Sequence, residues 1–394
     1  MENKMTNLPQ GWEVKTLSEI GEIITGSTPS KSNVEFYRKD YPFFKPSDFE
    51  QGYFLENAGD NLSKLGFGKA RQLPPKTILV VCIGSLGKVA LTRVIGSCNQ
   101  QINAIIPHKN IISEYIYYYC ISSKFQSILF SKAPQTTLAI FNKTEFSKLE
   151  IIYPKDIKEQ ERIVGILDFA FSKIDENIKK AKENLANIDE LMQSALQKAF
   201  NPLKDNAKEN YKLPQSWEWK SLEEISENIS AGGDKPKNCT ESKTAKNQIP
   251  VYANGVNNGL VGYTDKATII KPSLTISARG TIGFVCIRKE PYFPIVRLIS
   301  LIPCENILCL HYLYFCLNFF IAKGEGSSIP QLTIPKFKSL QIPLPPLKEQ
   351  EQIAEHLDFV FEKAKALKEL YTKELKDYEE LKQSLLNKAF KGEL

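Results

Sequence analysis

Residues 158–161 read Lys-Glu-Gln-Glu, and residues 348–351 read the same four amino acids. The match continues at the constant offset of 190, through Leu-Asp-Phe at 167–169 and 357–359, to Lys-Ala-Phe at 198–200 and 388–390. No residue has been gained or lost between the two copies. The chain therefore contains two segments of equal length that follow one pattern, and this pattern decides the fold.

Apolar residues recur every three or four positions in both copies, which is the spacing of an amphipathic helix. Neither copy contains a proline. At about 1.5 Å per residue, each copy predicts a rod on the order of 60 Å long. Because one helix cannot bury its own apolar stripe in water, we expect the two rods to pack on each other. The predicted seam consists of Ile163, Leu167, Ile174, Ile178, Leu185, Ile188 and Met192 with Ile353, Leu357, Val360, Leu367, Leu375, Leu381 and Leu385.

The regions before the rods are also repeated. Leu-Pro-Gln at residues 8–10, followed by Trp12-Glu13, returns at an offset of 205 as residues 213–215 and Trp217-Glu218. Residues 78–89 and 274–285 each contain β-branched and apolar runs around a Gly-x-x-Gly turn, which predicts a β-hairpin in each half. An aromatic-rich helix follows later in each half. We expect two mixed α/β (α+β) domains at 1–155 and 204–345, each followed by a rod, at 156–203 and 346–394.

Composition bounds the class of protein. The 394 residues are 42% apolar and 24% charged, which is ordinary for a soluble protein of two or more domains. No apolar run approaches a membrane span and no signal core opens the chain, so we expect a cytoplasmic protein without membrane contact. The eight cysteines form no CxxC pair and are expected to be reduced. The rods are slightly acidic, and the rest of the chain carries +9, which favours a polyanionic partner.

Catalytic motifs are missing. The chain has neither a dinucleotide-binding glycine motif nor a phosphate-binding loop. A nuclease centre at Asp234, Glu241 and Lys243 lacks a surrounding strand pattern, so a chance occurrence is favoured. A zinc site at residues 304–316 lacks paired ligand spacing, and a core helix with buried thiols is favoured there. We therefore predict a protein without catalytic residues, metal ligands or bound cofactor.

Direct readout of duplex DNA needs short polar side chains for base edges among Lys and Arg for phosphates. The regions that differ between the two halves are rich in both. The candidates in the first domain are Thr28, Lys31, Arg38, Lys45, Lys64, Lys69, Arg71, Ser85, Lys88, Gln100, Gln101, Gln135 and Thr136. Those in the second are Lys235, Lys237, Tyr252, Asn254, Asn257, Asn258, Arg279, Thr281, Arg297, Ser327, Ser328 and Gln331. Each position alone is more simply explained as a solvated surface residue. The DNA-binding hypothesis therefore rests on the two sets of residues taken together.

The chain resembles the specificity subunit of type I restriction-modification systems. Four repeated features carry this resemblance: the Leu-Pro-x-x-Trp-Glu start, the Gly-x-x-Gly hairpin, the Lys-Glu-Gln-Glu segment after Pro154 and Pro346, and the helix ending in Lys-Ala-Phe. The resemblance covers essentially the whole chain. It implies two target-recognition domains joined by two helices that pair as an antiparallel coiled coil, with an internal pseudo-twofold.

By this resemblance, each domain reads one half of a split, asymmetric site in double-stranded DNA, and the helices set the unread spacer. The helices recruit two methyltransferase subunits carrying S-adenosylmethionine and, in the full complex, two restriction subunits that use ATP and Mg. Val296 and Arg297 stand where the first half has Gln100 and Gln101, so the two halves should read different sequences. The alternative is a coiled-coil scaffold with two protein-binding modules.

Overall fold

The computed structural model describes residues 8–132, 140–200, 216–255, 258–321, 324–325 and 332–394. The chain forms two compact units. The first unit contains residues 1–181 and 373–394, and the second contains residues 182–372. Each unit therefore contains one globular domain together with parts of both long helices.

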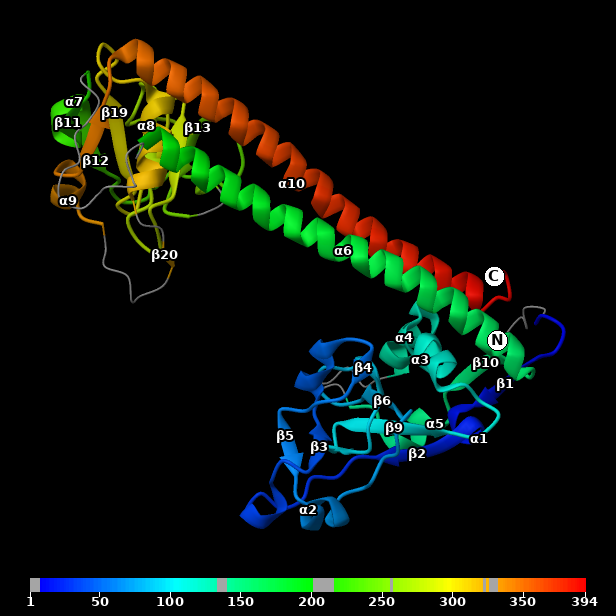
Figure 1. Ribbon diagram of the computed structural model, residues 1–394. Helices are drawn as coiled ribbons and strands as arrows, with labels where there is room; N and C mark the ends of the chain where they lie inside the picture. The colour runs from blue at the N-terminus through cyan, green and yellow to red at the C-terminus, as the bar shows by residue number, and fades with distance from the viewer. Residues whose placement is uncertain (1–7, 133–139, 201–215, 256–257, 322–323, 326–331) are drawn as a thin grey trace. The chain divides into compact units, whose positions relative to one another are not determined.

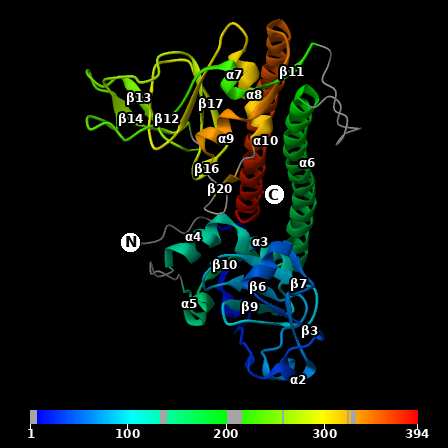
Figure 2. The same ribbon diagram turned by 90° about the vertical axis from the view of Figure 1, so that its left-hand side faces the viewer.

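The first unit is built on a five-stranded sheet that is antiparallel except for its last pair. Across the sheet the strands are β2 (Gly21–Thr25), β9 (Ile102–Pro107), β6 (Ile78–Val81), β7 (Val89–Thr92) and β4 (Phe54–Leu55). A smaller sheet contains β5 (Asp60–Leu62), β3 (Tyr41–Phe44) and β8 (Ser97–Cys98), and β1 (Trp12–Thr16) pairs with β10 (Glu150–Pro154). The helices are α1 (Leu17–Ile20), α2 (Lys64–Lys69), α3 (Ser113–Ile121), α4 (Ser123–Lys132) and α5 (Lys143–Ser147), and α3 covers β6 and β7 (Figure 2).

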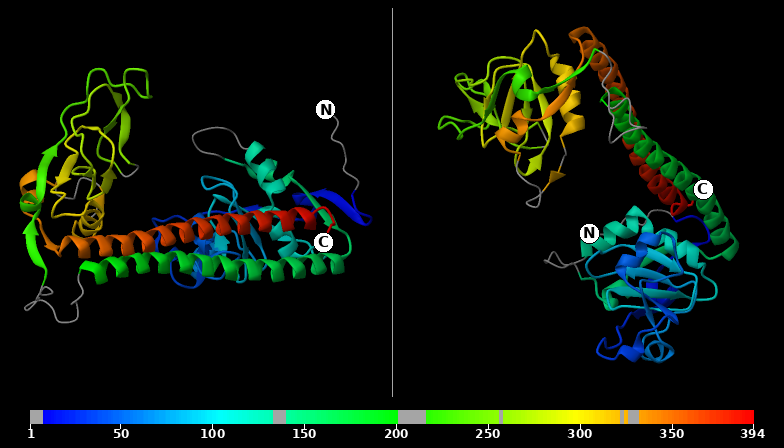
Figure 3. Two further views of the ribbon diagram at one scale, coloured as in Figure 1. Left: turned by 90° about the horizontal axis from the view of Figure 1, so that it is seen from above. Right: turned by 60° about the vertical axis from the view of Figure 1, so that its left-hand side comes forward.

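The second unit repeats this plan with a main sheet of four strands. Its main sheet contains β12 (Ser226–Ala231), β19 (Ile299–Pro303), β15 (Ser273–Ile276) and β17 (Val285–Arg288). A three-stranded sheet contains β14 (Leu260–Thr264), β13 (Ile249–Tyr252) and β18 (Phe293–Pro294). Two further pairs are β11 (Glu218–Ser221) with β21 (Gln341–Leu344), and β16 (Thr281–Ile282) with β20 (Gly324–Glu325). The helices are α7 (Leu222–Ile225), α8 (Leu310–Phe320) and α9 (Ile334–Lys338), and α8 packs on β15 and β17 (Figure 3). The predicted mixed α+β class is confirmed.

The predicted hairpins form because glycine occupies the positions that other residues avoid. β6 pairs with β7, and β15 pairs with β17, both antiparallel. Gly84 and Gly87 have φ angles of +81° and +90°, and Gly280 and Gly283 have +69° and +82°. These left-handed conformations carry no steric cost for glycine. The same turn geometry therefore connects the central strands of both domains.

The two rods are single uninterrupted helices, α6 (Ile157–Phe200) and α10 (Leu347–Ala389). Within each unit they lie side by side and antiparallel (Figure 1). In the first unit Lys382 Nζ contacts Asp175 Oδ1 at 2.5 Å, and in the second Lys368 pairs with Asp189. The predicted pairing of the two helices is confirmed. None of the helices in the described ranges is long and apolar enough to cross a membrane.

The seam of α10 differs from the prediction at two positions. Leu367 and Leu381 are 42% and 47% exposed, so neither lies in the seam. The neighbouring Lys368 and Lys382 face α6 instead, at the offset of 190 from Ile178 and Met192. A lysine can lie along an apolar seam because its methylene stem packs while its ammonium reaches an acidic partner. The other predicted seam residues are buried or partly buried: Ile163, Leu167, Ile174, Ile178, Leu185, Ile188, Met192, Ile353, Leu357, Val360, Leu375 and Leu385.

Each long helix contributes to two different hydrophobic cores. Helix α6 starts in the core of the first unit and ends in the core of the second, where Phe200 is 1% exposed. Helix α10 starts in the second core and ends in the first, and the following Phe390 is 6% exposed. The ring of Phe390 lies 5.0 Å from that of Tyr119, and the ring of Phe200 lies 5.4 Å from that of Tyr312. The end of one repeat therefore completes the domain of the other.

The glutamine of each Lys-Glu-Gln-Glu segment is fully buried at the start of its helix. Gln160 Oε1 accepts a hydrogen bond from Ile112 N at 2.9 Å, while its Nε2 donates to Pro154 O at 2.9 Å. Gln350 Oε1 accepts from Cys309 N at 2.9 Å, and its Nε2 donates to Pro345 O at 2.8 Å. Each glutamine thus joins three elements: a long helix, the strand before it and the start of the aromatic helix. This explains why the motif recurs.

Replacing Gln160 or Gln350 with methionine is expected to destabilise its unit by about 2–3 kcal/mol, because the methionine leaves a buried amide and a buried carbonyl without partners. Urea unfolding of the full chain, followed by hydrogen exchange in each unit, measures the loss. Gln193→Met on the exposed face of α6 is the matched control and should leave stability unchanged. Equal effects at the buried and exposed glutamines would contradict this role.

Candidate nucleic-acid interface

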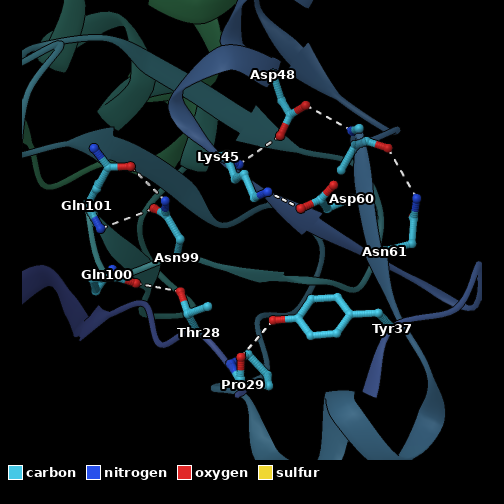
Figure 4. A network of polar contacts seen from close by, with 12 residues as sticks. Thr28, Pro29, Tyr37, Lys45, Asp48, Asp60, Asn61, Asn99, Gln100 and Gln101 are labelled. Carbon is cyan, nitrogen blue, oxygen red and sulfur yellow. Dashed lines mark hydrogen bonds and ion pairs between the residues drawn. The ribbon is translucent and has the colours of Figure 1, made fainter. Parts of the chain in front are cut away.

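In the first unit, the predicted polar residues Thr28 and Gln100 are brought together by two loops. The turn at residues 99–102 closes with Ile102 N donating to Asn99 O at 3.2 Å, and Gly26 N donates to Ile102 O at 2.9 Å. Thr28 Oγ1 donates to Gln100 Oε1 at 2.5 Å (Figure 4). Both side chains are exposed. Their amide and hydroxyl groups are the types that bond base edges.

The buried Asn99 side chain stabilises this turn by two hydrogen bonds to Gln101. It is 7% exposed, its Nδ2 donates to Gln101 Oε1 at 2.8 Å, and its Oδ1 accepts from Gln101 N at 3.1 Å. Gln101 Nε2 in turn donates to Ile83 O at 3.3 Å, just after β6 and directly before the Gly-x-x-Gly turn. Gln101 is therefore tied to the framework, and Gln100 is the more available of the two. Sequence reasoning did not select Asn99, although an asparagine directly before two glutamines is a signal for such a turn.

The predicted basic residues of the first unit fall into two groups. Lys45 pairs with Asp60, and Lys88 pairs with Glu50, so both already have acidic partners (Figure 4 shows the first pair). The remaining candidates are exposed: Lys31, Arg38, Lys64, Lys69 and Arg71, with Ser85 in the hairpin turn. Arg71 bonds the Thr25 carbonyl, which places it beside the loop that carries Thr28. We expect the exposed group to supply most of the phosphate neutralisation.

Tyr37 adds order to the same region. Its hydroxyl donates to Pro29 O at 2.6 Å, directly after Thr28 (Figure 4). Burial raises the pKa of Tyr37, so the phenol keeps the proton that it donates. The loop at residues 27–30 is thus fixed from both sides.

In the second unit, Asn254 connects the turn at residues 295–298 to the central sheet. Its Nδ2 donates to Val296 O at 2.6 Å, and its Oδ1 accepts from Ala278 N at 2.8 Å. Arg279 directly follows Ala278 in the sequence, and both Arg279 and Arg297 are exposed. The predicted residues Asn254, Arg279 and Arg297 are therefore brought to one end of the sheet.

Arg288 is a candidate that sequence reasoning missed. It is 6% exposed, its Nη2 donates to Asn258 O at 2.6 Å, and its Nε donates to Thr275 Oγ1 at 3.0 Å. Its guanidinium carbon lies 3.6 Å from the centre of the Tyr252 ring, a cation–π stack. Arg288 thereby fixes the predicted residues Tyr252 and Asn258. Its place at the end of an apolar strand gave no signal in the sequence, because the contact crosses thirty positions of the chain.

Some predicted residues cannot be placed in this arrangement. Lys235 and Lys237 lie exposed after Gly232-Gly233, and Thr281 lies in β16. Six candidates lie outside the described residues: Gln135, Thr136, Asn257, Ser327, Ser328 and Gln331.

The two metal hypotheses weighed from the sequence find no support in the described residues. No group of three or more His, Cys, Asp or Glu side chains there could hold a metal ion. His311 Nδ1 instead lies 2.7 Å from Asp358 Oδ2, and Cys316 is fully buried, which raises its thiol pKa. In the first unit the equivalent aspartate, Asp168, binds a residue from a different position of the aromatic helix: the Tyr118 hydroxyl donates to Asp168 Oδ1 at 2.6 Å. The aspartate of the repeated Leu-Asp-Phe thus positions each domain on its helix.

The helices expose apolar side chains at repeated positions. Phe169 and Phe359, separated by 190 residues, are 71% and 60% exposed. Leu191 and Leu381, also separated by 190, are 55% and 47% exposed. Each unit contains one of these phenylalanines and one of these leucines. Each unit therefore exposes the same pair of apolar residues.

Comparison with known proteins gives consistent matches. The sequence model described as the type I restriction modification DNA specificity domain matches residues 9–187 and 214–376. The specificity subunit of the type I restriction enzyme HindI from Haemophilus influenzae is 39% identical over 176 residues, which cover 43% of this chain and 38% of that protein. The MjaIX specificity subunit from Methanocaldococcus jannaschii is 24% identical over 397 residues, covering 92% and 89%. A chain solved in work on the assembly and conformational transition of the type I R-M system has the same fold, with a TM-score of 0.82 at 19% identity over 99% of this chain and 100% of that chain.

Proposed function

This chain belongs to the type I restriction modification DNA specificity family, and we propose that each of its two domains reads one half of a bipartite, asymmetric site in double-stranded DNA. One observation carries the proposal. The two domains present equivalent turns, residues 99–102 and 295–298, on equivalent strands, but fill them with different side chains. A repeated framework with different polar surfaces suits the reading of two different half-sites.

The helix pair would dock two methyltransferase subunits and set the unread spacer between the half-sites. The repeated exposed pairs, Phe169 with Leu381 and Phe359 with Leu191, support two copies of one partner. An aromatic side chain that becomes buried on binding is a common anchor of such an interface. The equal lengths of the two copies support a constant spacer.

Catalysis would come entirely from the partners. Methyltransferase subunits would supply S-adenosylmethionine, and restriction subunits, where present, would supply ATP-driven translocation and Mg-dependent cleavage. This chain would contribute only DNA recognition and assembly, acting in the cytoplasm. The buried thiols agree with a role that uses no reactive cysteine, since burial raises the pKa of both Cys82 and Cys98 to about 12.

Co-expression with a methyltransferase subunit should yield a stable complex that methylates one bipartite, asymmetric motif. Long-read sequencing of the host DNA identifies the motif. The chain alone should neither methylate nor cleave DNA. Methylation without a bipartite motif would refute the proposal.

Duplex binding by the complex should also weaken steeply as salt rises, because phosphate neutralisation releases counterions. A scaffold with two protein-binding modules would show no such salt-dependent DNA binding. This measurement therefore separates the proposal from its alternative even when methylation is absent.

A further inference from the structure

Two adjacent residues in the second unit adopt a backbone conformation that their side chains disfavour. Val296 has φ +52° and Arg297 has φ +58°. In this left-handed region a side chain crowds the following carbonyl, and a β-branched residue is a genuine outlier. Within the described ranges, only Lys76 and Asn258 share positive φ without being glycine. The turn at 295–298 is therefore strained where a glycine would be relaxed.

Hydrogen bonds on every side hold this strained turn. Val296 N donates to Gly233 O and Arg297 N donates to Gly232 O, both at 2.8 Å. Leu298 N closes the turn onto Ile295 O at 3.1 Å, and Asn254 bonds the Val296 carbonyl. A Cβ on Gly232 would lie 2.6 Å from Ile295 N, so the supporting loop can approach only because it has glycine there. The surroundings thus over-determine the conformation, as they do at strained functional sites.

The strain presents two side chains to solvent and buries neither. Val296 is 52% exposed, while its neighbours Ile295 and Leu298 are 3% and 2% exposed. Arg297 is also exposed, and its guanidinium makes no hydrogen bond or ion pair to any part of the chain that the structure describes. Packing in the hydrophobic core therefore does not explain why Val and Arg occupy positions 296 and 297. A valine that is strained and exposed is better explained by a contact outside the chain.

The equivalent turn of the first unit has different chemistry. Gln100 and Gln101 there keep ordinary backbone angles, and their amides bond Thr28, Asn99 and Ile83. The second turn has no side-chain amide at all. It offers one apolar branched group beside one guanidinium. These two groups match different features of the major groove: an apolar side chain contacts the thymine methyl, and an arginine bonds guanine O6 and N7 together.

We propose that the Val296–Arg297 turn is the base-reading element of the second domain, with Arg297 recognising a guanine and Val296 contacting the methyl group of an adjacent thymine. The inference rests on the proposed function and narrows it to a half-site that contains neighbouring guanine and thymine. Both side chains are exposed in this left-handed turn, where a partner can reach them. The strain is maintained because a relaxed glycine would supply no reading group.

The test uses the full chain in complex with its methyltransferase subunits. Each variant is assayed by methylome sequencing and by the melting temperature of the complex. Val296→Gly should leave the melting temperature unchanged or raise it by up to about 4 °C, because glycine relieves the backbone strain. The same variant should lose the thymine preference at one position of one half-site. Arg297→Gln should lower discrimination at the neighbouring guanine by about 5- to 150-fold, and shift it toward adenine.

Lys76→Gly is the matched control. Lys76 also has positive φ, at +66°, but lies at the opposite end of β6 from the turn at 99–102. It should change neither half-site. Unchanged half-sites in both Val296→Gly and Arg297→Gln would overturn the inference. So would uniform weakening of Arg297→Gln on all sequences, which marks a phosphate contact. A wild-type complex without any bipartite motif would instead overturn the proposed function.

Discussion

Replacing Phe390 with alanine is expected to destabilise the first unit by about 3–5 kcal/mol, although Phe390 follows α10, the helix that comes after the second domain in the sequence. The ring is 6% exposed and packs edge-on against Tyr115 and Tyr119, with centroid distances of 5.4 and 5.0 Å. Alanine would leave a cavity among these aromatic rings. Such a cavity cannot collapse easily, because the Tyr115 hydroxyl is fixed by its 2.9 Å bond to Ile152 O.

Hydrogen exchange localises this effect. Amides of β6 and β9 should exchange faster in Phe390→Ala, while those of β15 and β19 should be unaffected. Phe200→Ala is the matched variant and should give the reverse pattern, since Phe200 packs against Tyr312 and Phe319 in the second unit. If Phe390→Ala opened the second unit instead, the crossed contribution of the helices would be wrong.

The long helices could be predicted because their signals are local and repeated. Heptad spacing and the constant offset identify them, and α6 and α10 begin and end within a few residues of the predicted bounds. The errors at Leu367 and Leu381 have a physical cause. Hydrophobicity alone favours leucine over a neighbouring lysine, whereas the seam is set by helix geometry. Asp175 and Asp189 stabilise Lys382 and Lys368 in the seam. The apolar periodicity of a single helix cannot predict such ion pairs, because they join residues of two different helices.

The candidate interface was predictable in composition but less so in geometry. The polar residues at 28, 100, 254 and 258 were selected because their side chains suit base edges. Their supports, Asn99 and Arg288, were missed because each acts through contacts between distant strands. The left-handed turn at Val296 was also hidden, since valine normally argues for a strand and against such a turn. Tertiary hydrogen bonds override that local preference.

Removing residues 180–186 from α6 together with residues 371–377 from α10 is expected to shorten the spacer of the recognised site by about 3 base pairs. The pairs Asp175–Lys382 and Asp189–Lys368 show that these two segments face each other, so the deletion keeps the seam in register. Seven residues correspond to about 10 Å of helix, and duplex DNA rises about 3.4 Å per base pair. Methylome sequencing of complexes with the shortened chain gives the new spacer directly.

The two half-sites should keep their sequences in this variant, because the turns at 99–102 and 295–298 lie within the domains and outside the deleted segments. Binding should nevertheless weaken. Seven residues rotate a coiled coil very little, whereas 3 base pairs rotate the duplex by about 100°, so the shorter spacer must be overtwisted to present both half-sites. Deleting residues 180–186 alone should abolish methylation, since it displaces the Asp189–Lys368 contact from its register. Altered half-sites in the paired deletion would contradict the separation of the two tasks. If that separation holds, spacer length and half-site sequence vary independently, because one depends on helix length and the other on the reading turns.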